Sequence, residues 1–141
     1  MKKAILIFTV LFTFLLSSVS FASCNLDLRR WQWVSSTDEF GVYFDIQTLK
    51  YVNNVAEVWQ CFHFPHSCDL HPNVGEHYHY CLYYIYYNNN TIGVKSYLYR
   101  DGNGRVLKSD TFQYVDPVPI IPDSIGEEVA IAVRKRLTRR Y

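Results

Sequence analysis

The sequence lacks the short motifs that mark the common classes of enzyme. It contains no Gly-x-Ser-x-Gly nucleophile elbow, no phosphate-binding glycine loop and no His-Glu-x-x-His helix, and only six of its 141 residues are glycine. Cys68 has His66, Asp69 and His71 nearby in the sequence, but a cysteine in such a proline-containing loop is more typical of a disulfide than of a nucleophile. We therefore predict that the protein has no catalytic residues and is not an enzyme.

The sequence also lacks an excess of either charge. Lysine and arginine number 14 and aspartate and glutamate 13, a net charge of +1. Basic residues gather only at 134–140, where the last turn of a helix favours them. A nucleic-acid-binding domain normally carries a larger basic surface. We therefore predict no nucleic-acid partner.

Long hydrophobic runs are missing everywhere except at the N-terminus. Lys2 and Lys3 precede an apolar run at residues 4–16, and Ser20-Phe21-Ala22 fits a small-x-small cleavage site. The run is shorter than the ~20 apolar residues of a spanning helix. We predict a signal peptide over residues 1–22, cleavage after Ala22, export to the bacterial periplasm or cell surface, and one domain over residues 23–141. The mature chain would hold twelve basic and thirteen acidic residues.

An alternative processing route begins at Cys24. The sequence Phe21-Ala22-Ser23-Cys24 approximates a lipobox, which would place a lipid on Cys24 and anchor the protein to a membrane. Lipidation would leave Cys61, Cys68 and Cys81 as an odd set in an oxidising compartment, where cysteines normally pair. Simple cleavage is therefore favoured, and a membrane contact is expected only if Cys24 is lipidated.

Between the signal segment and the C-terminus, the chain reads as short strands separated by turns. Period-two, aromatic-rich segments lie at 31–35, 41–45, 55–64, 78–87, 92–99 and 106–114. Prolines at 117, 119 and 122 are expected to end strand pairing and to lead into a helix. Asp123 or Ser124 can cap that helix, and Ser124 with Glu127 fits a capping box. An apolar stripe of Ile125, Val129, Val133 and Leu137 would pack that helix on the sheet. We predict an α+β fold, an antiparallel meander of about six strands with one C-terminal helix packed on it.

Ordered patches of aromatic and turn residues run along residues 31–137. They are Trp31-Gln32-Trp33-Val34, Asp38, Gly41-Val42-Tyr43-Phe44-Asp45, Val58-Trp59, Tyr99-Arg100-Asp101-Gly102-Asn103-Gly104 and Pro122-Asp123-Ser124-Ile125-Gly126-Glu127. Together they resemble the surface-adhesin protein E-like family of small exported bacterial proteins. The resemblance implies an antiparallel sheet backed by a helix, surface or periplasmic location, and adhesion to host components. The chain departs from the family in its histidine- and cysteine-rich stretch and in having no cysteine in the terminal helix.

Residues 61–81 hold all five histidines and three of the four cysteines. One permitted hairpin register places Cys61 opposite Cys81 and His63 opposite His79, so that these residues and His77 share one face. Opposed residues lie close enough for a disulfide. This register favours a Cys61–Cys81 disulfide, with Cys68 paired to Cys24, although four cysteines allow three connectivities.

The same histidines offer an alternative, a zinc or copper site formed by His63, His77 and His79. Imidazole suits both metals. The spacing matches no common zinc motif, and a cysteine held in a disulfide is not a thiolate ligand. The favoured interpretation is a disulfide-stapled hairpin without a cofactor, whose histidines are solvated or stacked among tyrosines. A metal site and a pH-responsive histidine cluster are the alternatives.

Residues 78–87 contain six tyrosines. Strand alternation places Tyr83 and Tyr87 on one face and a second set on the other, and a single sheet with one helix must expose part of one set. Tyrosine suits interfaces because it offers a large area with a polar tip, whereas Trp31, Trp33 and Trp59 are expected to fill the core. We predict a non-enzymatic exported binding module that binds a host or cell-surface macromolecule or a second copy of the chain. The predicted binding surface is Tyr78, Tyr80, Tyr84 and Tyr86.

Overall fold

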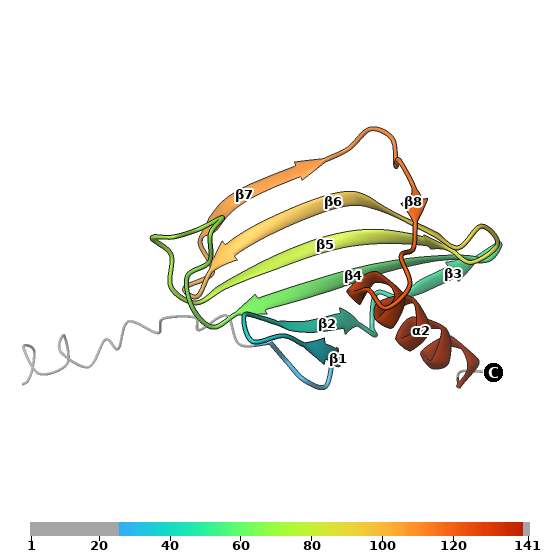
Figure 1. Ribbon diagram of the computed structural model, residues 1–141, viewed down its shortest axis with the longest axis horizontal. Helices are drawn as coiled ribbons and strands as arrows, with labels where there is room; N and C mark the ends of the chain where they lie inside the picture. Colours follow the sequence, from blue (N-terminus) through green and yellow to red (C-terminus); the bar gives the residue numbers. More distant parts are fainter. Residues whose placement is uncertain (1–25, 140–141) are drawn as a thin grey trace, which may run out of the picture.

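The computed structural model describes residues 26–139, so the predicted signal peptide and Cys24 lie outside the described residues. Eight strands form one antiparallel sheet, and α2 is the helix of this part of the chain (Figure 1). In chain order the elements are β1 (Trp31–Ser36), β2 (Gly41–Asp45), β3 (Lys50–Val52), β4 (Val55–Phe64), β5 (His77–Tyr86), β6 (Thr91–Asp101), β7 (Val106–Thr111), β8 (Val118–Pro119) and α2 (Ile125–Thr138).

The longer strands lie side by side in the order in which they occur in the chain. The sheet order is β1-β2-β4-β5-β6-β7, with β3 paired to β4 and β8 paired to β6. The α+β fold class and the antiparallel meander are therefore confirmed. One detail of the prediction is wrong: Pro117 and Pro119 do not end strand pairing, because β8 is a two-residue strand at the sheet margin, where proline is tolerated.

The hydrophobic core lies between the sheet and α2. Val129, Val133 and Leu137 are buried on the helix, as the apolar stripe predicts, and they join a cluster with the fully buried Val42 and Val58 of the sheet. Ser124, one of the two predicted caps, caps the helix, since its Oγ accepts a hydrogen bond from the Glu127 amide at 3.3 Å. The Glu127 carboxylate accepts from the Asp123 amide at 2.8 Å, one residue before the cap, so the predicted capping box forms only in part. Among the described residues, no helix combines the length and the apolar content needed to cross a membrane.

The helix covers only part of the sheet. Figure 1 shows α2 beside the end of the sheet where β3 lies, while the loop of residues 65–76 folds at the opposite end, where β4 ends and β5 begins. We call the sheet face under α2 the helix face and the opposite face the outer face. The two ends of the helix face are therefore covered by different kinds of structure.

A buried carboxylate ties the start of the domain to the end of β2. Asp45 is fully buried, and its Oδ2 accepts hydrogen bonds from Arg30 Nη2 at 2.7 Å and from Thr48 Oγ1 at 2.7 Å. Its Oδ1 accepts one from the Gln47 amide at 2.9 Å. Burial alone would raise the pKa of Asp45, but these hydrogen bonds, led by that of Arg30, hold it below the ordinary value of 3.8.

We expect Asp45→Asn to lower the free energy of unfolding by about 2 kcal/mol near neutral pH, because asparagine keeps the shape and loses the charge-assisted hydrogen bonds. A carboxylate whose pKa is lowered by folding stabilises the protein above its unfolded pKa, and that contribution is lost as the pH falls through the folded pKa. Urea titrations at about pH 7 and about pH 3 should therefore show the difference between variant and wild type shrinking. Asp38→Asn, at an exposed position, is the control. An equal difference at both pH values would assign the effect to packing.

Candidate functional site

Strands β4 and β5 pair one residue away from the predicted register. Cys61 lies opposite Tyr80, and Cys81 lies opposite Gln60. A shift of one residue moves every side chain of a strand to the other face. The predicted pairing of Cys61 with Cys81 is therefore wrong, because the two cysteines lie on opposite faces of the sheet.

The core under α2 explains this register. Ala56 and Val58 of β4 lie opposite Ile85 and Tyr83 of β5, and all four side chains pack in the same apolar cluster. The predicted register would have turned Ala56 and Val58 away from the face of Ile85. Burial of apolar area therefore selects the observed pairing.

His63 does not share a face with His77 and His79, which corrects the predicted metal set. It lies opposite Tyr78 on the outer face, and the two rings stack with centroids 4.7 Å apart. His63 Nε2 lies 2.8 Å from Glu76 Oε1, which also accepts a hydrogen bond from the Tyr78 hydroxyl at 2.9 Å. These contacts, that of Tyr78 first, hold the pKa of Glu76 below its ordinary value. His63 is thus engaged on the other side of the sheet.

Three other histidines meet on the helix face, beneath the loop of residues 65–76. The ring centroids of His71 and His77 are 5.4 Å apart, those of His71 and His79 are 5.2 Å apart, and those of His77 and His79 are 5.1 Å apart. Cys68, from the same loop as His71, places its Sγ 3.4 Å from His77 Nε2. We call Cys68, His71, His77 and His79 the histidine cluster.

The two strand histidines of the cluster are deeply buried, and the cluster contains polar atoms that make no hydrogen bond to a described residue. His77 is 0% exposed and His79 is 5% exposed. His77 Nδ1 donates to the Gly75 carbonyl at 2.7 Å, which leaves Nε2 to accept from the Cys68 thiol. Nε2 of His71 and Nε2 of His79 are buried with no hydrogen-bond partner in the described part of the chain. Such atoms are uncommon in folded proteins.

The surroundings lower the pKa of two of these imidazoles, those of His71 and His79. Burial, followed by the charges of His77 and His71, lowers the pKa of His79 to about 4. Burial, followed by the charges of His77 and Lys108, lowers the pKa of His71. Within residues 26–139, no group of three or more His, Cys, Asp or Glu side chains is arranged so that it could hold a metal ion as it stands. The cluster therefore brings three imidazoles, two of them with a lowered pKa, beside one cysteine.

Sequence reasoning selected His77 and His79 but missed His71 as their neighbour. The alternation within β5 is a local signal, whereas the position of His71 depends on how the loop folds. There the His71 amide donates to the Cys68 carbonyl at 2.9 Å, in a turn that holds the two residues together over β5. In the sequence, the spacing Cys68-x-x-His71 is a signal that could have indicated a turn bringing these two residues together.

The outer face carries the predicted tyrosine row. Tyr78, Tyr80, Tyr84 and Tyr86 alternate with the residues that face α2, as predicted. Tyr78, however, is only 2% exposed, because it packs with Trp31 and Cys61 in a second cluster. It is therefore not part of an accessible binding surface, and the other three tyrosines are partly exposed.

A shallow pocket lies at one end of this row. It has a volume of about 280 Å³ and is lined by Arg30, Trp31, Trp59, Tyr80, Leu98 and Arg100. The Trp31 and Tyr80 rings have centroids 5.5 Å apart, and the Arg30 guanidinium lies over the Trp31 ring. Arg100 Nε is buried and makes no hydrogen bond to any described residue. We call this site the aromatic pocket. Its two tryptophans were predicted to fill the core, but Trp59 is partly exposed.

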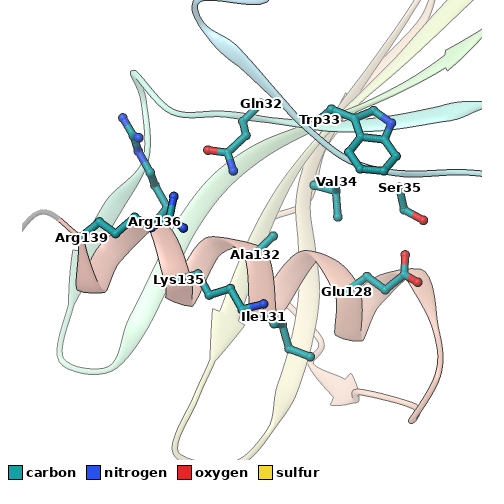
Figure 2. Close-up of a pocket in the computed structure, with 10 residues that line it drawn as sticks. All are labelled: Gln32, Trp33, Val34, Ser35, Glu128, Ile131, Ala132, Lys135, Arg136 and Arg139. Atoms are coloured by element: carbon teal, nitrogen blue, oxygen red, sulfur yellow. The ribbon is translucent and has the colours of Figure 1, made fainter.

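A groove of about 480 Å³ separates β1 from α2 (Figure 2). Figure 2 shows Trp33 and Ser35 of β1 on one side and Glu128, Ile131 and Lys135 of α2 on the other. Trp33 is 56% exposed, so its predicted place in the core is wrong. The groove is lined by one carboxylate, that of Glu128, and by the basic side chains of Lys135, Arg136 and Arg139 together with apolar groups.

Comparison with protein-family models, with curated proteins and with solved structures gives no match for this chain. The resemblance to the surface-adhesin protein E-like family stays a prediction. The same holds for disulfides that include Cys24. No disulfide links the three cysteines that the structure describes.

Peptide mapping of the unreduced protein should find no Cys61–Cys81 disulfide, because these cysteines lie on opposite faces. Detection of two peptides joined through Cys61 and Cys81 would contradict the observed register.

In timed alkylation with iodoacetamide, followed by mass spectrometry, Cys81 should react more slowly than Cys68. Burial raises the pKa of the Cys81 thiol to about 11, so little thiolate forms near neutral pH, whereas Cys68 is partly exposed.

Proposed function

We propose that the protein is a non-enzymatic exported binding module, adhesin-like in its mode of action, that uses the outer face of its sheet. The aromatic pocket is the observation that supports this proposal. It combines two tryptophans, a tyrosine and two arginines in a hollow large enough for one side chain. Tryptophan, tyrosine and arginine are the residue types that contribute most to protein–protein binding energy.

The charge of the pocket favours an acidic partner. Arg30 and Arg100 both line it, and no carboxylate does. Arg30 is already paired with Asp45, but Arg100 has a buried Nε without a partner among the described residues. Arginine binds carboxylates through parallel hydrogen bonds. The partner proposed here is a protein segment that inserts an acidic side chain beside Arg100 and stacks on Trp59.

The tyrosine row extends this surface along β5. Tyr84 and Tyr86 continue from Tyr80 on the same face, and each is partly exposed. Tyrosine adds contact area at low entropic cost, with a hydroxyl for hydrogen bonding. An extended segment lying along the row would bury these rings while its acidic residue occupies the pocket.

The proposal is tested with a displayed library of random peptides selected on purified protein of residues 23–141. We expect enrichment of peptides that combine Asp or Glu with apolar residues. Arg100→Gln and Trp59→Ala should each weaken binding of an enriched synthetic peptide by at least about tenfold, as removal of a central interface residue commonly does. Fluorescence anisotropy measures the affinity.

Matched substitutions away from the pocket serve as controls. Arg139→Gln makes the same change of charge near the end of α2, and Tyr114→Ser removes another exposed aromatic side chain. Neither should change the affinity. Equal weakening by the controls, enrichment of acidic glycans in place of peptides on parallel arrays, or self-association through this face would each contradict the proposal.

A further inference from the structure

The spacing of the histidine cluster matches the space around one metal ion. Zinc binds imidazole nitrogen at ~2.0–2.1 Å, so three imidazoles on one tetrahedral zinc have ring centroids roughly 5 Å apart. The three observed separations are 5.1, 5.2 and 5.4 Å. The ring planes are inclined by 47°, 80° and 76°, so the rings are not stacked in parallel on one another.

The cysteine fits the same geometry. With a zinc–sulfur distance of ~2.3 Å, a sulfur and a nitrogen on one tetrahedral zinc lie roughly 3.5 Å apart. Cys68 Sγ and His77 Nε2 are separated by 3.4 Å. A thiol and an imidazole at this distance are close enough to share a proton or a metal.

Two of the three nitrogens that a metal would need make no hydrogen bond to a described residue. Nε2 of His71 and Nε2 of His79 are buried and make no hydrogen bond within residues 26–139. His77 donates its Nδ1 proton to the Gly75 carbonyl, and a backbone carbonyl in this role commonly orients a metal-bound histidine. A metal could therefore take up Nε2 of His71 and Nε2 of His79 without displacing a hydrogen bond, and at His77 Nε2 it would replace the contact with the Cys68 thiol.

We propose that the histidine cluster is a zinc site whose ligands are Cys68 Sγ and the Nε2 atoms of His71, His77 and His79. Three imidazoles and one thiolate form a tetrahedral set that suits Zn²⁺. On binding, the Cys68 thiol gives up its proton to solvent, and the thiolate, the two unpartnered nitrogens and His77 Nε2 close on the ion.

The site has a route to solvent on the side of the cysteine. A hollow of about 470 Å³ adjoins Cys68, and its lining includes the carboxylates of Asp38, Glu39 and Asp69. Carboxylates at the mouth favour the approach of a cation. On the inner side, Phe64 stacks on His77 at 4.7 Å and Tyr99 stacks on His79 at 3.9 Å.

The metal would link the loop of residues 65–76 to β5. Cys68 and His71 come from the loop, whereas His77 and His79 come from the strand. Because no group within residues 26–139 is arranged to hold a metal ion as it stands, the proposed coordination requires the loop to bring Cys68 and His71 closer to His77 and His79. The zinc site does not depend on the binding function proposed for the outer face.

The test uses reduced, metal-free protein of residues 23–141, titrated with Zn²⁺ against a chromophoric chelator and separately with Co²⁺. We expect one ion per chain. The Co²⁺ form should show the strong visible bands of a tetrahedral centre and a sulfur-to-cobalt charge-transfer band. Cys68→Ser and His71→Asn should each weaken Zn²⁺ binding by more than roughly 10–100-fold. That range is the loss of affinity when a residue that only hydrogen-bonds to a metal ligand is removed, whereas these two variants remove a ligand itself.

The chain offers two matched controls. His63→Asn removes the histidine that spacing alone would choose, and His66→Asn removes an exposed histidine from the same loop. Both should leave the affinity unchanged and leave intact the rise in thermal midpoint that Zn²⁺ gives to the wild type. His79→Asn changes a buried ligand and could prevent folding. The test therefore relies on the zinc affinities of Cys68→Ser and His71→Asn, whose side chains are partly exposed. Absence of stoichiometric zinc, a cobalt spectrum without the sulfur band, or equal loss in the His63→Asn protein would overturn the proposal.

Discussion

The register of the β4–β5 hairpin is the constraint on which the rest of this structure depends. Side chains alternate along a strand, so one register assigns every residue of both strands to a face. Val58 and Ile85 are fully buried in the core under α2. A slip of one residue would turn one strand's apolar set outward, at a cost of about 1.5–3 kcal/mol for each large side chain. The same assignment puts the histidine cluster on the helix face and the tyrosine row on the outer face.

The covering of the helix face explains why its two ends differ chemically. Where α2 lies, the covering side chains are Val129, Val133 and Leu137, and they pack in one cluster with buried apolar residues of the strands such as Val58 and Ile85. Beyond the helix, the loop of residues 65–76 forms the cover (Figure 1). A loop can bring polar groups such as Cys68 and His71 over the sheet, and so His77 and His79 can be buried there with polar neighbours.

The outer face follows a different rule, because α2 does not cover it. Its aromatic residues pack partly on one another, as Trp31, Tyr78 and Cys61 do, and leave Trp59 and Tyr80 partly accessible beside two arginines. The two proposed sites therefore lie on opposite faces of β5. Substitutions at one are not expected to alter the other, since sites with no shared contacts act nearly independently.

The sequence by itself determined the fold class, the order of the strands and the capped amphipathic helix, because period-two patterns, turn residues and the Ser124–Glu127 cap are local properties. Alternation also separated Tyr80 and Tyr84 from Tyr83 correctly. Only the tertiary structure decided the hairpin register, since that depends on burial summed over two strands and a helix distant in the chain. It alone brought His71 and Cys68 to His77 and His79, because residues 65–76 carry no periodic pattern from which their path could be predicted.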